Sequence, residues 1–266
     1  MNKSIRSGDV ILEAQKLRKE FGGLVAVADV SGKVYAHTLH SIIGPNGAGK
    51  TTLFNLLSGT MPPTSGRVLF KGKDITHLPP HKMAHLGIGR SFQITNIFPN
   101  LTVLENVRLA AQARGGDNFK MLRHYRHFPQ YEQKALEILA QVSLTGKALA
   151  LARNLSHGDK RKLELGIMLA GEPELLLLDE PTAGMSSEQV PALIEVIDNI
   201  MQRGDKTILL VEHRMDIVMS ISDFITVMHQ GRILAEGAPE DIADNEAVQN
   251  AYLGALYGDF DAKREV

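Results

Sequence analysis

The sequence has no cysteine, no long apolar run and no excess of either charge. The absence of cysteine among 266 residues excludes disulfide scaffolds, thiol catalysis and cysteine-based zinc sites. No apolar run exceeds five residues, whereas a membrane-spanning helix needs about 20. Lys and Arg total 29 against 30 Asp and Glu, so the basic excess typical of nucleic-acid binders is missing. We therefore expect a soluble intracellular protein with no nucleic-acid partner.

Short apolar segments alternate with helical patterns through much of the chain. The runs LLLL and ILLV are apolar on both faces, which is typical of parallel strands covered by helices. Ser186 with Gln189 three residues later forms a capping-box pattern, which predicts the start of a helix. The alternation predicts an α/β fold, with strands at 38–43, 174–179 and 207–213 and helices at 50–60, 158–171 and 187–202.

Two other regions depart from this alternation. The first 36 residues contain two strand-like segments around the turn Gly22–Gly23, which predicts an antiparallel ribbon. The stretch 96–157 has helical spacing and a capping box at Thr102 and Glu105. We therefore expect one domain over 1–266, in four parts. These are 1–95 (antiparallel β subdomain and the first part of the core), 96–157 (helical subdomain), 158–237 (the rest of the core) and 238–266 (helical tail).

A glycine-rich segment follows the first predicted core strand and matches the pattern G-x-x-x-x-G-K-[ST]. Its residues are Gly44, Pro45, Asn46, Gly47, Ala48, Gly49, Lys50 and Thr51, with Thr52 opening the next helix. Glycines let successive backbone N–H groups point at phosphate oxygens, and the following helix adds its positive end. The lysine supplies a charge to the β- and γ-phosphates, and the threonine hydroxyl is a Mg²⁺ ligand. The segment predicts a nucleotide phosphate site.

Two adjacent carboxylates, Asp179 and Glu180, follow the apolar run Leu175–Leu178. Carboxylates at the end of a buried strand are costly unless they meet a cation or water. We expect Asp179 to hold Mg²⁺, directly or through water, and Glu180 to polarise an attacking water.

With further motifs in the expected order, the chain resembles the ATP-binding-cassette (ABC) ATPases over nearly its whole length. Phe21 stands where the family stacks an aromatic ring on adenine, and Gln93 matches the glutamine that senses the γ-phosphate and Mg²⁺. The segment 155–159, with Ser156 and Gly158, matches the family signature, and His213 matches the switch histidine. The resemblance implies a P-loop ATPase core with an N-terminal antiparallel subdomain and a helical insertion.

The same resemblance implies the site. Lys50, Gln93, Glu180 and His213 form the catalytic set, and ATP and Mg²⁺ are the cofactors. Thr51, Gln93 and Asp179 surround the metal. Ser156 and Gly158 contact the nucleotide bound to a second ATPase subunit, so a lone chain is expected to be nearly inactive.

The chain departs from the family pattern at several positions. The signature commonly reads Leu-Ser-Gly-Gly-Gln, and here His157 and Asp159 replace its Gly and Gln. The loop 183–186 differs from the common Ser-Ala-Leu-Asp. Gly32 stands where an apolar strand residue is usual, and His37 where a turn usually has glycine. We expect the last two to weaken the ribbon locally.

Several segments favour one branch of the family. Residues 21–27, 90–93, 98–107 and the tail 251–254 resemble the ATP-binding subunits of bacterial importers for branched-chain amino acids, and also of urea and amide importers. The ATPase of lipopolysaccharide export shares the tail segment 251–254 but usually not the opening segment 21–27. This implies a homo- or heterodimer of ATPase subunits, two permease subunits and, indirectly, an extracytoplasmic solute-binding protein. The expected location is peripheral, on the cytoplasmic face of the inner membrane.

Soluble ABC ATPases of DNA repair or translation are the rival class. The repair type carries a long coiled coil between the two nucleotide motifs, but only 129 positions separate Lys50 from Asp179. The translation type carries two cassettes in one chain, and this chain has one. A nucleotide-binding regulator without ATPase activity is a third interpretation.

Overall fold

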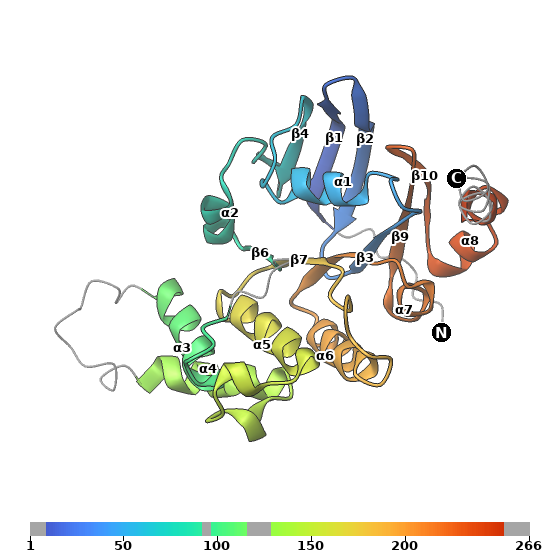
Figure 1. The fold of residues 1–266 in the computed structure, drawn as a ribbon. Coiled ribbons are helices and arrows are strands. Elements are labelled where there is room, and N and C mark those ends of the chain that lie inside the picture. The colour runs from blue at the N-terminus through green and yellow to red at the C-terminus, as the bar shows by residue number, and fades with distance from the viewer. Residues whose placement is uncertain (1–8, 92–96, 116–128, 253–266) are drawn as a thin grey trace. The chain divides into compact units, whose positions relative to one another are not determined.

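The computed structural model describes residues 9–91, 97–115 and 129–252, and the chain forms two compact units (Figure 1). The first unit comprises residues 1–83, 177–180 and 207–266, and the second comprises 84–176 and 181–206. Among the described residues, no helix is long and apolar enough to cross a membrane.

An antiparallel sheet with the order β2-β1-β4-β5 lies in the first unit. Its strands are β1 (Val10–Phe21), β2 (Leu24–Tyr35), β4 (Ser65–Phe70) and β5 (Lys73–Asp74). Phe21 pairs with Leu24 across the two glycines, so the predicted ribbon and its turn are confirmed. The positions Lys16 and Asp29 have positive φ, and the register between β1 and β2 shifts near them. These irregularities are β-bulges, which increase the local twist of the ribbon.

The second sheet of this unit runs in the order β10-β9-β3-β8-β7. Its strands are β3 (Leu39–Ile43), β7 (Leu175–Asp179), β8 (Thr207–Val211), β9 (Phe224–His229) and β10 (Arg232–Gly237). β3 is parallel to both β8 and β9. Every residue of β7 and β8 is buried, as the continuous apolar runs predict. The start of β7 belongs to the second unit, where β6 (Ile88–Arg90) is its neighbour.

The helices that accompany these sheets include α1 (Lys50–Leu57), α2 (Pro80–Leu86), α7 (Met215–Ile221) and α8 (Pro239–Ala243), and residues 246–252 are helical as well. The last residues of α2 belong to the second unit. Apolar side chains of α7 and α8, together with Val248, form one cluster with Ile43, Ile225 and Val227 of the sheet. This cluster fixes the end of β3, from which the glycine-rich segment starts.

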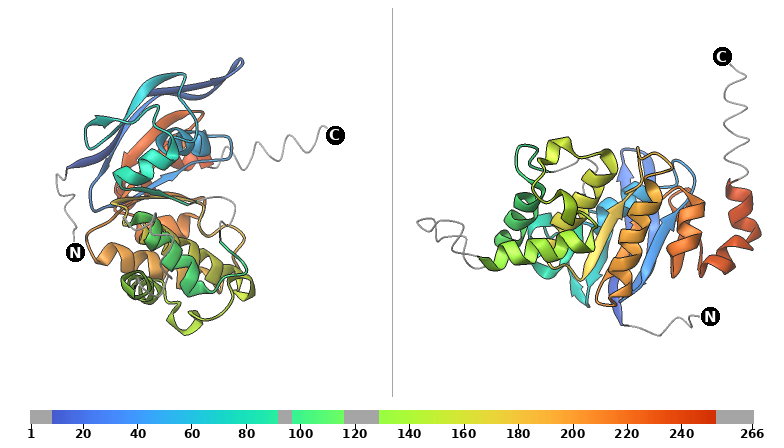
Figure 2. Two further views of the ribbon diagram at one scale, coloured as in Figure 1. Left: turned by 90° about the vertical axis from the view of Figure 1, so that its left-hand side faces the viewer. Right: turned by 90° about the horizontal axis from the view of Figure 1, so that it is seen from below.

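The second unit is helical. Its elements besides β6 are α3 (Val103–Arg114), α4 (Pro129–Gln141), the short 3₁₀ helices η2 (Thr145–Lys147) and η3 (Ala152–Asn154), α5 (His157–Ala170) and α6 (Val190–Gln202). The helices α3, α4 and α5 pack against one another, and their side-by-side arrangement is visible in Figure 2. The predicted capping box of α3 is confirmed, because Thr102 and Glu105 exchange side-chain and backbone hydrogen bonds.

The capping box predicted at Ser186 is wrong. α6 begins at Val190, its N-cap is Gln189, and no side chain caps it. Pro191 explains the difference, because proline has no N–H and suits only the first turn of a helix. A helix starting at Ser187 would place Pro191 in its second turn, where the N–H is needed. The proline therefore outweighs the Ser–Gln spacing.

His37 adopts a left-handed backbone conformation with φ of 62°. Glycine adopts this conformation without a steric penalty, which is why the turn usually carries it. The His37 amide donates to the Thr207 hydroxyl at 2.9 Å, and this bond holds the turn to the start of β8.

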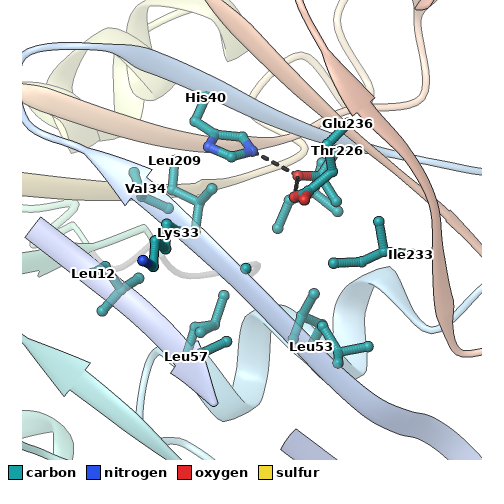
Figure 3. A pocket seen from close by; sticks show the side chains of 14 residues that line it. Leu12, Lys33, Val34, His40, Leu53, Leu57, Leu209, Thr226, Ile233 and Glu236 are labelled. Atoms are coloured by element: carbon teal, nitrogen blue, oxygen red, sulfur yellow. Dashed lines mark hydrogen bonds between the residues drawn. The ribbon is translucent and has the colours of Figure 1, made fainter. Parts of the chain in front are cut away.

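A chain of polar groups crosses the apolar core of the first unit beside a hollow of about 30 Å³ (Figure 3). Thr226 Oγ1 donates to Glu236 at 2.7 Å, so the Nε2 of His40, 2.8 Å away, donates to Thr226. The Nδ1 of His40 is then an acceptor, and it has no partner within the described part of the chain. Burial lowers the pKa of His40 to about 4 and raises the pKa of Glu236. His40 is therefore neutral in the folded protein at neutral pH.

Candidate functional site

The glycine-rich segment forms the connection between β3 and α1 in the first unit. Three of its glycines, Gly44, Gly47 and Gly49, have φ of 152°, 76° and 96°. A Cβ at Gly44 would lie 2.2 Å from the carbonyl oxygen of Met228, and one at Gly49 would lie 2.4 Å from that of Ala26. Side chains are therefore excluded sterically at these two positions. The loop wraps tightly against β9 and β2 and leads directly into the first turn of α1.

Lys50 is buried at the start of α1, and its side chain turns back over the loop. Its Nζ donates to the carbonyl oxygens of Gly44 at 2.8 Å and Pro45 at 3.0 Å. Burial lowers the pKa of Lys50, and the nearby charges of Glu180 and Asp179 oppose this shift. The structure thus brings the lysine and the two predicted carboxylates together. This cationic group at a helix N-terminus is suited to an anion such as a phosphate.

Asp179 is the last residue of β7, and Glu180 follows it directly. Asp179 is buried, whereas Glu180 is partly exposed. Glu180 has a φ of 46°, which is strained for a residue with a side chain. Its amide donates to the carbonyl oxygen of Val211 at 2.9 Å, so the strained turn is tied to the end of β8. Glu180 therefore lies at the carboxyl end of β7, next to the carboxyl end of β8.

His213 lies two residues after Val211, whose carbonyl oxygen accepts the hydrogen bond from the Glu180 amide. The sheet therefore places the predicted histidine at the carboxyl end of β8, next to Glu180. Its side chain is 53% exposed. The side chain of Glu212 is fully buried and accepts hydrogen bonds from the amides of His213 at 3.0 Å and Arg214 at 3.4 Å. Sequence reasoning missed this role of Glu212. The clue was a carboxylate placed directly after the apolar run Ile208–Val211.

Phe21 ends β1, and 46% of its surface is exposed. The Nζ of Lys19 lies 5.3 Å from the centre of its ring. An exposed aromatic ring with a cation on one side is able to stack on a planar base. The predicted adenine contact is thus sterically available.

The two signature residues lie in the second unit. Ser156 is the N-cap of α5 and accepts a hydrogen bond from the Asp159 amide at 3.2 Å. Gly158 is buried in the first turn of α5. A Cβ at this position would lie 3.3 Å from Met185 Cε. Gln93 lies outside the described residues.

The first unit therefore collects the loop, Lys50, Asp179, Glu180 and His213 at the carboxyl ends of neighbouring strands. Oxygen donors such as the Thr51 hydroxyl and the Asp179 carboxylate are the ligands that Mg²⁺ prefers. Loop amides and Lys50 suit the phosphates. The residues present fit a metal-bound nucleotide.

Comparisons with known proteins agree with this chemistry. The family described as "ABC transporter" matches residues 27–183, and the family "Branched-chain amino acid ATP-binding cassette transporter" matches residues 232–256. BraF of Pseudomonas aeruginosa, a high-affinity branched-chain amino acid transport ATP-binding protein, is 42% identical over 249 residues. The match covers 92% of this chain and 98% of BraF. LivG of Escherichia coli K12, named in the same way, is 40% identical over 250 residues, with the same two coverages.

Solved structures give the same result. The ADP conformation of an ATP-binding cassette of an ABC transporter matches with a TM-score of 0.80 and 32% identity, covering 92% of this chain and 99% of that one. CbiO1 of Clostridium perfringens, part of the ABC transporter complex cbiONQ, matches with a TM-score of 0.77 and 25% identity, covering 97% and 100%. The predicted α/β P-loop fold is thereby confirmed. The chain belongs to the ABC transporter family and is one of its ATP-binding, ATP-hydrolysing subunits.

Proposed function

We propose that this chain hydrolyses ATP to energise the import of branched-chain amino acids. The observation that carries the proposal is identity of about 40% to BraF and LivG over 92% of the chain, joined to the match at residues 232–256. That second match lies outside the nucleotide motifs, so it supports the branch of the family and not merely the ATPase.

The site residues divide the chemistry among themselves. Lys50 binds the β- and γ-phosphates and stabilises charge as the γ-phosphoryl group leaves. Glu180 accepts a hydrogen bond from the attacking water and orients it. Gln93 and His213 contact the γ-phosphate region, and Phe21 stacks on the adenine. Mg²⁺, when held by Thr51, Gln93 and Asp179, supplies Lewis-acid charge neutralisation.

The proposed assembly supplies what one chain lacks. Ser156 and Gly158 contact the nucleotide bound to a second ATPase subunit, a copy of this chain or a paralogue. We also propose that the chain is one domain with the four parts predicted from the sequence, including the helical subdomain at 96–157. We place the chain on the cytoplasmic face of the membrane, bound to two permease subunits, with a solute-binding protein outside.

The other importer substrates have less support. The relatives named above are all branched-chain amino acid proteins, and none is named for urea, amides or lipopolysaccharide. The soluble repair and translation classes have no support from the relatives either.

The test measures uptake of radiolabelled leucine and urea in cells that lack the chain and in cells that express it again. We expect leucine uptake to fall in its absence and to return with the wild-type chain but not with Glu180→Gln. Purified Glu180→Gln should still bind ATP. Normal leucine uptake without the chain, with loss of urea uptake, would overturn the substrate assignment. Wild-type hydrolysis by Glu180→Gln would overturn the role of Glu180.

A further inference from the structure

Asp159 occupies an unusual position in the first turn of α5. Its side chain is only 15% exposed, and its Oδ2 accepts the hydroxyl proton of Ser156 at 2.8 Å. The family commonly has a neutral glutamine at this position. Here the single hydroxyl proton of Ser156 is already donated to a carboxylate. To donate to a phosphoryl oxygen, Ser156 must turn its hydroxyl away from Asp159.

The negative charge creates a second difficulty. A phosphoryl oxygen that accepts the Ser156 proton would lie within about two hydrogen-bond lengths of the Asp159 carboxylate, roughly 6 Å. Like charges at that separation repel, and a partly buried pair is only weakly screened by salt. An anion at this helix end therefore needs a cation that neutralises Asp159.

Lys147 provides that cation. Its Nζ forms an ion pair with Asp159 Oδ2, the same oxygen that accepts from Ser156. Burial raises the pKa of Asp159. Hydrogen bonds from Lys147 and Ser156, together with the charges of Lys147 and Lys162, lower this pKa by more than burial raises it, so the net shift is downward. Asp159 is thus ionised and paired with a cation.

The backbone around Lys147 is held firmly. Lys147 ends η2, and the segment that follows accepts the first amides of α3. The Val103 amide donates to the carbonyl oxygen of Ala150, and the Leu104 amide donates to that of Ala148, both at 2.9 Å. The lysine therefore reaches α5 from a loop that is anchored to α3.

Resting on the function proposed above, we propose that Lys147 is a positioning residue for the signature segment. It holds and neutralises Asp159, so that Ser156 is free to donate its hydroxyl to the γ-phosphate of the nucleotide on the partner subunit. The side chain of Lys147 is 52% exposed, and an ion pair made by so exposed a cation contributes little to stability. The main effect of Lys147 is therefore on nucleotide engagement and not on folding.

The test is a double-mutant cycle on the full chain, purified with the ATPase subunit it assembles with. The variants are Lys147→Ala, Asp159→Asn, the two combined, and Lys147→Arg. Lys134→Ala is the matched control, because it removes a comparable ion pair, to Glu172, on α4. ATPase rate against ATP concentration gives KM and kcat, and thermal unfolding monitors the fold.

We expect Lys147→Ala to raise the KM for ATP by about tenfold, with kcat and the unfolding temperature little changed. Asp159→Asn should rescue Lys147→Ala to within about twofold of wild type, because the charge to be neutralised is gone. Lys147→Arg should keep the wild-type KM, and Lys134→Ala should match wild type.

Two results would overturn the inference. One is a Lys147→Ala KM equal to that of Lys134→Ala, and the other is a double variant as impaired as Lys147→Ala alone. Failure of the proposed function gives a different pattern, because the wild-type assembly itself would not hydrolyse ATP or Ser156→Ala would leave the KM unchanged. Either result would remove the proposed role of Ser156, and this inference with it.

Discussion

The Nζ of Lys50 lies 2.8 Å from the carbonyl oxygen of Gly44, the first residue of the same loop. The lysine thus closes the loop, with a second bond to the carbonyl oxygen of Pro45. A phosphate that binds here offers the ammonium group a charged acceptor in place of neutral carbonyls.

Replacing Lys50 by Ala should lower the ATPase rate by about 100- to 1,000-fold, because one preorganised charge on the transferring phosphoryl group is lost. Lys50→Arg should not restore it, since the planar guanidinium cannot reproduce a compact ammonium between two carbonyls. ATP hydrolysis with the partner subunit present measures this. A rate for Lys50→Ala within tenfold of wild type would contradict the assignment.

Two glycines of the loop should respond differently to alanine. Gly44→Ala places a Cβ 2.2 Å from the Met228 carbonyl and should lower the free energy of unfolding by more than about 3 kcal/mol. Gly47→Ala meets no atom within 4 Å, so its cost is the positive φ alone, about 1–2 kcal/mol. Urea unfolding compares the two. Equal destabilisation would mean that the loop does not pack against β9 as described.

Glu212→Ala should destabilise the protein and slow turnover together. The amides of His213 and Arg214 would lose their charged acceptor, at a cost of about 2–4 kcal/mol in unfolding free energy. Because His213 would also lose its backbone anchor, His213→Ala added to Glu212→Ala should reduce the ATPase rate little further. If the losses of ATPase rate from the two single substitutions multiply in the double variant, Glu212 does not act through His213.

Acid should destabilise the first unit through His40. Its pKa is about 4 in the folded protein and about 6.5 when unfolded, so the unfolded state binds the proton first. The stability is fully present above pH 6.5 and falls by about 3 kcal/mol as the pH drops towards 4. Glu236, whose pKa is raised, acts in the opposite direction. The measurement is therefore the difference in urea unfolding between wild type and His40→Leu at pH 7 and pH 5.

The His40→Leu variant should lose less stability than wild type between these two pH values. Parallel losses would show that His40 is not neutral and buried in the folded protein.

Gly32→Ala should stabilise the protein by about 0.5–1 kcal/mol without changing ATPase activity. The new methyl group would lie 3.5 Å from Glu236 Oε1 and 3.6 Å from Ile233 Cδ1, at ordinary contact distance in the hollow near His40. Gly72→Ala is the contrast, because its φ of 74° makes a side chain strained. Thermal unfolding of both variants measures the two changes in stability. A destabilised Gly32→Ala would show that there is no room for a methyl group beside Glu236 and Ile233.

The sequence by itself determined the fold class, the phosphate loop and most local elements. These features depend on spacing along the chain: a glycine loop between a strand and a helix, apolar runs that end in carboxylates, and Thr102 three residues before Glu105. The Ser186 capping pattern failed for a reason that is also local, since Pro191 dictates where α6 begins. The order of the motifs along the chain is likewise a property of the sequence alone, and it indicates the family.

Only the tertiary structure decided which distant residues act together. His40 and Thr226 are 186 positions apart and meet because β3 and β9 are neighbours in the sheet. Glu212 holds the backbone of His213 because the sheet buries its carboxylate at the end of β8. The partner of Asp159 is likewise absent from any motif, because Lys147 reaches α5 from a loop that is fixed by α3. Such pairings depend on strand register and helix packing, which bring together residues whose separation along the chain carries no pattern.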